Sequence, residues 1–180
     1  GSTFSNFENN KFYNKAIILL AKFGFKKLDK IIFQNSDDKN YLRKKNILDA
    51  KSKIFRVNGS GVDLNYYPYS PKEEKENKKV FLMLSRLLID KGILEYINAA
   101  KLIKKKYPNV IFNLAGMPYE GSRAISIKSI KAWEDEKIIN YLGLLHDVRE
   151  SLINCDFYVL PSFYKEGIPR SLMEAMAIGR

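Results

Sequence analysis

The sequence predicts an α/β fold in which a parallel sheet carries helices on both faces. Short, continuous apolar runs recur between residues 80 and 160, and such runs are typical of strands covered on both faces. Segments with apolar residues three to four positions apart separate them, which indicates helices. Strand and helix alternate four times in this part of the chain. That alternation is characteristic of a parallel, doubly wound sheet.

The first 60 residues predict two strands and two helices. Residues 11–30 predict a basic helix whose apolar positions are Phe12, Ala16, Leu19, Leu20 and Phe23. It could lie on a membrane surface or cover a sheet. The second interpretation is favoured, because the apolar run Ile31–Phe33 follows as a candidate buried strand. The run Ser36-Asp37-Asp38 is expected to cap a short helix reaching about residue 45, and residues 53–57 predict another strand.

In the second half, the strands are expected at residues 80–84, 110–115, 138–142 and 157–160. Asp90 is expected to cap a helix over residues 92–106, and a further helix is expected around residues 126–133. Asp147 is expected to cap a short helix, and Pro169 to open the last one as a first-turn proline. The polar stretch 68–79 is the candidate linker.

Composition limits the classes of function. The chain has 180 residues, one cysteine (Cys155) and one histidine (His146), so neither an internal disulfide nor a histidine-clustered metal centre can form within it. The formal net charge of +11 favours anionic partners: phosphorylated small molecules, anionic lipid or nucleic acid. A solvated basic surface without a specific partner is the other interpretation.

The residues that follow the predicted strands are the candidates for ligand binding, because ligands of open parallel sheets bind beyond the carboxyl ends of the strands. The two residues directly after each strand are here called its exit. The four exits are Ser85-Arg86, Gly116-Met117, Gly143-Leu144 and Pro161-Ser162. Arg86 and Lys91 place a guanidinium and an ammonium near a helix start, which suits a diphosphate. They could equally be ordinary surface cations.

Glu166 and Glu174 are a second candidate pair, eight positions apart across a loop and a helix start. Carboxylates accept paired hydrogen bonds from vicinal hydroxyls, such as those of a ribose or hexose. Gly167 would leave room for a phosphate or sugar oxygen. This spacing is common by chance and does not decide the function by itself.

Six ordered motifs resemble the donor domain of the large retaining GT-B glycosyltransferase family that includes bacterial capsule and lipopolysaccharide enzymes. They are Asn58–Asp63, which carries two inserted residues relative to the family turn, and Leu84–Gly92, Leu114–Gly116, Tyr141–Gly143, Val159–Ser162 and Glu166–Ala177. The resemblance covers roughly residues 53–180, and more loosely the helix and strand before them.

The resemblance implies roles for these residues. Arg86 and Lys91 would hold the donor diphosphate, Glu166 would face the transferred sugar, and Glu174 would bind the ribose. The remaining donor-binding positions would be Gly167, Ile168, Pro169, Gly116, Gly143 and Leu144. The implied reaction is retaining sugar transfer from a nucleoside-diphosphate donor, most commonly a UDP-sugar, without a metal or other cofactor. The Pro169-Arg170-Ser171 variant resembles enzymes of surface-polysaccharide assembly, with saccharide or lipid-linked acceptors.

The resemblance also implies an incomplete enzyme. Residues 1–67 would be a remnant of the acceptor-side domain with the inter-domain crossover, and residues 80–180 an incomplete Rossmann-like nucleotide-sugar-binding domain. Such a chain is expected to be inactive alone. The expected location is the cytoplasm, at the inner face of the plasma membrane, with anionic lipid as a partner.

Two other classes of function stay open. One is a non-catalytic module that binds a nucleotide or phosphosugar. The other is a basic protein that binds nucleic acid or a membrane surface, although no basic stripe interleaved with aromatic residues is visible, so nucleic acid is not an expected partner. A dehydrogenase is disfavoured, because Arg86 and Lys91 stand where a glycine-rich turn would be expected.

Overall fold

The computed structural model describes residues 11–49, 51–72, 78–163 and 167–180. The described residues form two compact units, one of residues 11–61 with 167–170 and one of residues 62–163 with 171–180. The predicted linker at residues 68–79 begins inside the second unit, and its residues 73–77 lie outside the described part.

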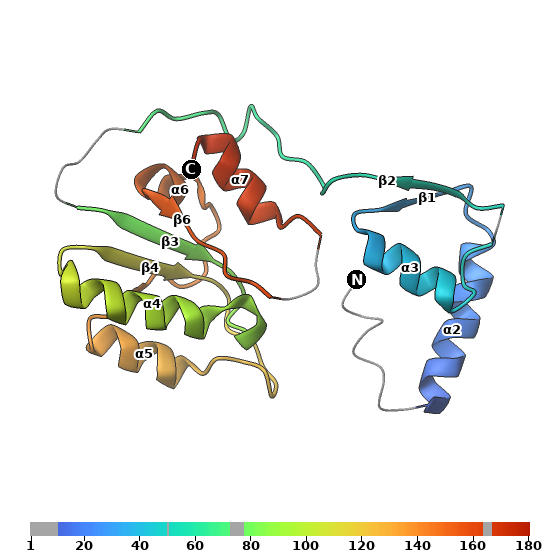
Figure 1. Ribbon diagram of the computed structural model, residues 1–180, viewed down its shortest axis with the longest axis horizontal. Helices are drawn as coiled ribbons and strands as arrows, with labels where there is room; N and C mark the ends of the chain where they lie inside the picture. The colour runs from blue at the N-terminus through green and yellow to red at the C-terminus, as the bar shows by residue number, and fades with distance from the viewer. Residues whose placement is uncertain (1–10, 50, 73–77, 164–166) are drawn as a thin grey trace. The chain divides into compact units, whose positions relative to one another are not determined.

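The second unit contains a parallel sheet of four strands (Figure 1). These are β3 (Val80–Leu84), β4 (Ile111–Ala115), β5 (Asn140–Tyr141) and β6 (Phe157–Tyr158), in the order β5-β4-β3-β6. All three pairings are parallel, so the predicted α/β fold is confirmed. The outer strands are shorter than predicted, because β5 and β6 each pair along two residues of one neighbour.

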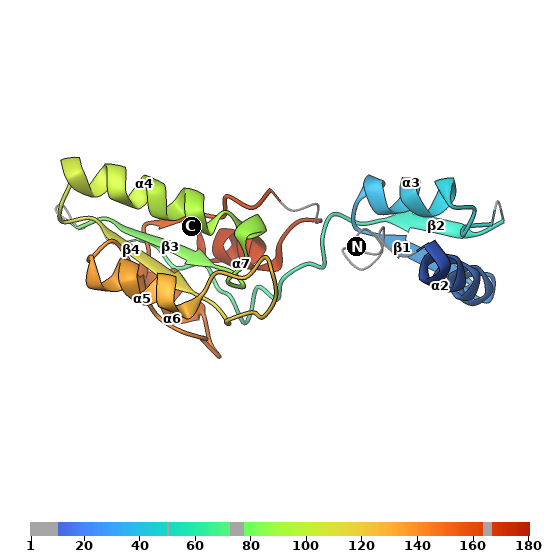
Figure 2. The same ribbon diagram turned by 90° about the horizontal axis from the view of Figure 1, so that it is seen from below.

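Two apolar clusters cover the two faces of this sheet. One gathers residues of α4 (Ile93–Lys106) and α5 (Ile127–Asp135) around Met83, and the other gathers residues of α6 (Arg149–Asn154) and α7 (Arg170–Ile178) around Leu82 and Leu84. Successive side chains of a strand point to opposite faces, so β3 supplies both clusters. The continuous apolar run of β3 is thereby explained. Figure 2 shows the helices beside this sheet from a second direction.

The first unit is a parallel pair of strands with two helices. Its elements are α2 (Lys11–Phe25), β1 (Lys30–Phe33), α3 (Ser36–Lys44) and β2 (Lys53–Arg56). Ile31 and Phe33 of β1 form a core with residues of both helices, which lie on the same side of the strands in Figure 1. The side chains on the other face, Ile32 and Phe55, are 64% and 49% exposed.

The helix α2 covers the strands, but with a different face from the one expected. Ile18, Ala21 and Phe25 pack against the core of this unit. Leu19, Leu20 and Phe23, which were expected to face the sheet, are 65–72% exposed. The expectation about the apolar face was therefore wrong, because a helix that is apolar over much of its circumference does not reveal from its sequence which side packs. None of the described helices has the length and apolar character needed to cross a bilayer.

Three of the expected helix caps differ in the structure. Asn35, rather than Ser36, caps α3, and its side-chain oxygen accepts from the backbone N–H of Asp38 at 2.7 Å. Asp90 does not cap α4, because it lies in a short 3₁₀ turn (Ile89–Lys91) and Gly92 is the residue before the helix. Asp147 precedes the cap position of α6, although it accepts from the backbone N–H of Arg149 at 3.0 Å.

Candidate functional site

The exits of β3 and β4 lie in direct contact at the carboxyl edge of the four-stranded sheet. The backbone N–H of Ser85 donates to the carbonyl of Ala115 at 3.0 Å, and that of Leu87 to Met117 at 3.1 Å. A Cβ atom placed on Gly116 would lie 1.6 Å from the carbonyl oxygen of Ser85. Only glycine therefore fits where these two exits meet.

The exit of β5 is joined to the same point. The backbone N–H of Gly116 donates to the carbonyl of Gly143 at 2.8 Å, and the hydroxyl of Tyr141 donates to the carbonyl of Gly116 at 2.8 Å. Burial raises the pKa of Tyr141, and the nearby Glu134 carboxylate adds to the effect, so the phenol keeps its proton as a donor. Leu144, next along the chain, is 54% exposed.

The exit of β6 meets the turn that follows β3. The backbone N–H of Phe163 donates to the carbonyl of Asp90 at 3.1 Å. Gly92 has a φ of +79° and stands so close that a Cβ atom would lie 2.2 Å from the carbonyl oxygen of Pro161. Lys91 lies in this junction and is only 8% exposed. The structure thus brings Lys91 beside the exit of β6.

Arg86 is exposed at this edge. Its guanidinium carbon lies 5.6 Å from the centre of the Tyr119 ring, which comes from the loop after β4. An aromatic face attracts a guanidinium, so the ring limits where Arg86 can point. The loop is also tied to the turn after β3 by the ion pair between Arg123 and Asp90.

Glu174 lies in α7 and is 8% exposed. One turn earlier, the hydroxyl of Ser171 lies 2.7 Å from that of Tyr158, and Tyr158 also reaches the carbonyl of Leu84 at 3.3 Å. Burial raises the pKa of Tyr158 to about 12, against a lowering by its hydrogen bond to Ser171, and the Glu174 carboxylate adds to the rise. Glu174 therefore lies one helical turn after the residue of α7 that the Tyr158 phenol contacts.

Four of the predicted residues lie outside the described part of the second unit. Gly167, Ile168 and Pro169 belong to the first unit, where a Cβ atom on Gly167 would lie 3.2 Å from the Cβ of Gln34. Glu166 lies outside the described residues. The roles of these four residues stay predictions.

Four side chains at this edge were missed by the sequence analysis: Tyr119, Arg123, Tyr141 and Tyr158. The tyrosines of β5 and β6 could have been noticed in the sequence, because both lie in predicted strands. A tyrosine that packs within a sheet usually needs a hydrogen-bond partner for its hydroxyl. Tyr119 and Arg123 had none, since their partners lie more than 30 positions away in sequence.

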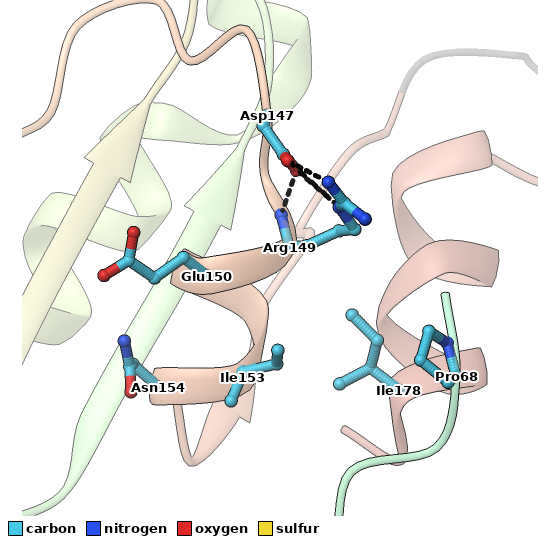
Figure 3. A pocket seen from close by; sticks show the side chains of 7 residues that line it. All are labelled: Pro68, Asp147, Arg149, Glu150, Ile153, Asn154 and Ile178. Atoms are coloured by element: carbon cyan, nitrogen blue, oxygen red, sulfur yellow. Dashed lines mark hydrogen bonds and ion pairs between the residues drawn. The ribbon is translucent and has the colours of Figure 1, made fainter. Parts of the chain in front are cut away.

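A separate hollow of about 430 Å³ lies elsewhere in the second unit (Figure 3). Its lining is Pro68, Asp147, Arg149, Glu150, Ile153, Asn154 and Ile178, which includes none of the predicted donor-binding residues. The Arg149 guanidinium is hydrogen-bonded to Asp147, an interaction that lowers the pKa of that carboxyl to about 2, and it stacks 4.1 Å from the Tyr66 ring centre. Because Arg149 is already paired with Asp147, this hollow is a weaker candidate for binding a diphosphate than the sheet edge with the exposed Arg86.

The parallel sheet, with its four exits joined at one edge, has the fold of the GT-B glycosyltransferases. The chain belongs to the family described as glycosyl transferases group 1, whose model matches residues 69–180, more than half of its length. The resemblance carried by the six motifs is thereby confirmed.

Two curated relatives are bacterial glycosyltransferases. The first is the N,N'-diacetylbacillosaminyl-diphospho-undecaprenol alpha-1,3-N-acetylgalactosaminyltransferase of Campylobacter jejuni, to which the chain is 33% identical over 172 residues. The match covers 89% of the chain and 43% of that protein. It is 28% identical over 131 residues to the putative colanic acid biosynthesis glycosyltransferase WcaL of Escherichia coli, covering 68% of the chain and 32% of that protein. The chain thus spans less than half the length of these relatives.

Solved structures agree on the fold. TarM superposes with a TM-score of 0.67 and 26% identity over 97% of this chain and 33% of TarM. HepE from Anabaena, in complex with UDP, superposes with a TM-score of 0.68 and 21% identity over 96% of this chain and 48% of HepE. Because HepE is only 21% identical to this chain, the similarity shows a shared fold and carries no conclusion about function.

Proposed function

We propose that the protein carrying this chain is a retaining hexosyltransferase that moves a sugar from a nucleoside-diphosphate donor, a UDP-sugar first among them, to a lipid-linked saccharide acceptor. The family supports this, as does a relative named for an acceptor on diphospho-undecaprenol. The chain spans 43% of that relative, so we propose that transfer needs residues outside this sequence.

The observation that carries the proposal is the exposed Arg86 at the exit of a central strand, with Lys91 in the adjoining junction. In the transfer, the bond between the anomeric carbon and the diphosphate oxygen breaks. A bond forms from the same face to the acceptor oxygen, whose proton is released. Negative charge develops on the leaving diphosphate, and cations held in advance stabilise it.

Glu174 completes the donor site in this proposal by accepting hydrogen bonds from the ribose hydroxyls. Glu166 would face the transferred sugar, and residues 167–169 would shape the loop around it. We also propose that the reaction needs no metal. Unchanged transfer after dialysis against EDTA is the expected result, and loss of transfer that Mg²⁺ or Mn²⁺ restores would contradict it.

The test is titration of the intact protein with UDP, UDP-N-acetylgalactosamine, UDP-glucose and GDP-mannose by calorimetry. We expect the uridine ligands to bind, and Arg86→Ala and Glu174→Ala each to weaken binding by tenfold or more, about 1.4 kcal/mol. Arg149→Ala is the matched control, because it removes the same charge from the separate hollow of Figure 3. If Arg149→Ala weakens binding as much as Arg86→Ala, the effect is one of net charge and the site assignment is wrong.

A non-catalytic module that binds a nucleotide sugar is the alternative. A transfer assay with a radiolabelled donor and a lipid-linked saccharide separates the two functions. Donor binding without transfer by the intact protein, over a panel of acceptors, would favour the binding module.

We further propose that the protein works on the cytoplasmic side of an anionic membrane. The net charge of +11 supports this, as does α2, whose exposed Leu19, Leu20 and Phe23 stand among basic residues. Lys15, Lys26 and Lys27 are exposed around them, and the Lys27 ammonium lies 4.6 Å from the centre of the Phe23 ring. Apolar and cationic side chains together favour the interface of an anionic bilayer.

Co-sedimentation with vesicles tests the membrane proposal. Binding is expected to vesicles of phosphatidylcholine with phosphatidylglycerol and not to phosphatidylcholine alone, and to decline as salt increases. The double substitution Leu19→Glu/Leu20→Glu should reduce it, whereas the exposed Leu102→Glu on α4 should not. Unchanged binding with an intact circular dichroism spectrum would mean that another surface meets the membrane.

A further inference from the structure

The phenol of Tyr158 joins two parts of the proposed donor site. Tyr158 lies in β6, paired with Leu82 of β3. Its hydroxyl lies 3.3 Å from the carbonyl oxygen of Leu84, the last residue of β3, and 2.7 Å from the hydroxyl oxygen of Ser171. Leu84 stands two residues before Arg86, and Ser171 three residues before Glu174. One side chain therefore links the strand that leads to Arg86 with the helix that carries Glu174.

The location of Tyr158 suits it to hold this link. Its ring packs against the apolar cluster between the sheet and α7, which contains Leu82, Leu84 and Ala175. The raised pKa, caused first by burial, keeps the phenol protonated at neutral pH. A phenol has one proton, so it donates to Ser171 at the shorter distance or to the carbonyl of Leu84 at the longer one. The serine hydroxyl can donate to the phenol in the second case, so both contacts persist.

Glu174 depends on this link for its position. Residues three apart on a helix lie on the same face, so Ser171 and Glu174 both point toward the side of α7 that meets Tyr158. The Glu174 carboxylate also adds to the raised pKa of Tyr158, in keeping with this shared face. Removing the hydroxyl while keeping the ring would leave the packing intact and release the first turn of α7.

We propose that Tyr158 is a positioning residue for nucleotide binding: its hydroxyl, held between the carbonyl of Leu84 and the hydroxyl of Ser171, sets α7 so that Glu174 meets the ribose of the donor. The inference rests on the proposed function, in which Glu174 binds the ribose and Arg86 the diphosphate. It therefore concerns recognition of the ribose and leaves recognition of the diphosphate unchanged.

The experiment compares UDP, 2′-deoxy-UDP and inorganic pyrophosphate as ligands of the intact protein by calorimetry. Tyr158→Phe and Ser171→Ala are each expected to weaken UDP binding about fivefold, the size of one hydrogen bond. Pyrophosphate binding should stay within about twofold of the wild type, and the preference for UDP over 2′-deoxy-UDP should shrink. The double variant should be no weaker than either single variant, because the two substitutions remove the same link.

Tyr107→Phe is the control, since it makes the same chemical change at an exposed residue after the end of α4. Equal loss of UDP and pyrophosphate binding in Tyr158→Phe, or additive losses in the double variant, would overturn the positioning role. So would a loss of stability with unchanged nucleotide affinity.

Glu174→Gln separates this inference from the proposed function. If Glu174→Gln reduces the preference for ribose and Tyr158→Phe does not, only the role of Tyr158 is wrong. If Glu174→Gln leaves UDP binding unchanged, or the wild type binds no UDP, the proposed donor site is wrong and the positioning role with it.

Discussion

Gly116 is the residue on which the join between β3 and β4 depends. The carbonyl oxygen of Ser85 occupies the space where a Cβ atom would stand, 1.6 Å away. Because that oxygen belongs to the backbone, it cannot move aside as a flexible side chain would.

We expect Gly116→Ala to lower the free energy of unfolding by roughly 2–3 kcal/mol and to weaken nucleotide binding by separating the exits of β3 and β4. Urea unfolding followed by the fluorescence of Trp133, the single tryptophan, measures the first effect in the second unit. Gly121→Ala, in the same loop, is the control for backbone strain. Its φ of +125° also disfavours a side chain, but no atom lies within 4 Å of the position that its Cβ would take, so its cost is that of the backbone without a clash. Similar costs for the two substitutions would mean that the contact at Gly116 relaxes easily.

Asp156, which directly precedes β6, binds both Lys72 and the first residue of β3. Its carboxylate lies 2.5 Å from the Lys72 ammonium and accepts from the backbone N–H of Val80 at 2.6 Å, and the side chain is 7% exposed. Burial by itself would raise the pKa of this carboxyl. The hydrogen bonds from Lys72 and Val80 outweigh burial, and the pKa is lowered.

Asp156→Asn is therefore expected to lower the free energy of unfolding by about 2 kcal/mol at pH 7. A carboxyl whose pKa is lower in the folded state stabilises that state above its usual pKa of 3.8, and this stabilisation is lost as the pH falls through the folded-state pKa. The difference between wild type and variant should thus shrink below about pH 4. A difference that stays constant down to about pH 2.5 would show that the charge does not matter.

At the scale of elements, α3 shows how a helix start is decided. Both Asn35 and Ser36 are residue types that cap helices. Asn35 has the extended backbone of a cap, with φ −144° and ψ 160°, and its side chain accepts from Asp38. Ser36 is already inside the helix, and its hydroxyl accepts from the Arg56 guanidinium at 3.2 Å.

We expect Asn35→Ala to destabilise α3 by about 1 kcal/mol, and thus to speed amide exchange in residues 36–44 about fivefold. Ser36→Ala is the neighbouring control and should have little effect, because an exposed hydrogen bond contributes little. Exchange followed by mass spectrometry of peptides from the first unit measures both. The reverse order of effects would assign the cap to Ser36.

At the scale of the whole molecule, the two units differ in how completely their sheets are covered. β3 and β4 each have strand neighbours on both sides, and apolar clusters lie on both faces of their sheet. The pair β1–β2 leaves Ile32 and Phe55 exposed on one face. Backbone amides exchange faster where local opening of the structure breaks fewer apolar contacts.

Amides of β3 and β4 are therefore expected to exchange at least tenfold more slowly than those of β1 and β2, about 1.4 kcal/mol in opening free energy. Hydrogen exchange of the intact protein at neutral pH measures this. Equal protection in the two units would mean that the face of Ile32 and Phe55 is covered in solution.

The α/β class, the parallel sheet and the family could all be predicted from the sequence. Each rests on local periodicity and on ordered motifs, which are properties of neighbouring residues. The sequence also placed Arg86, Gly116 and Gly143 at strand exits, because parallel strands bring their carboxyl ends to one edge.

Three features became known only from the folded chain: the face of α2 that packs, the pairing of Asp90 with Arg123 in place of a cap on α4, and the link that Tyr158 makes between β3 and α7. Each of these depends on a partner distant in sequence: Arg123 lies 33 positions from Asp90, and Leu84 lies 74 from Tyr158. Such contacts are chosen by packing and by the need of buried polar groups for partners. No local pattern in the sequence records that choice.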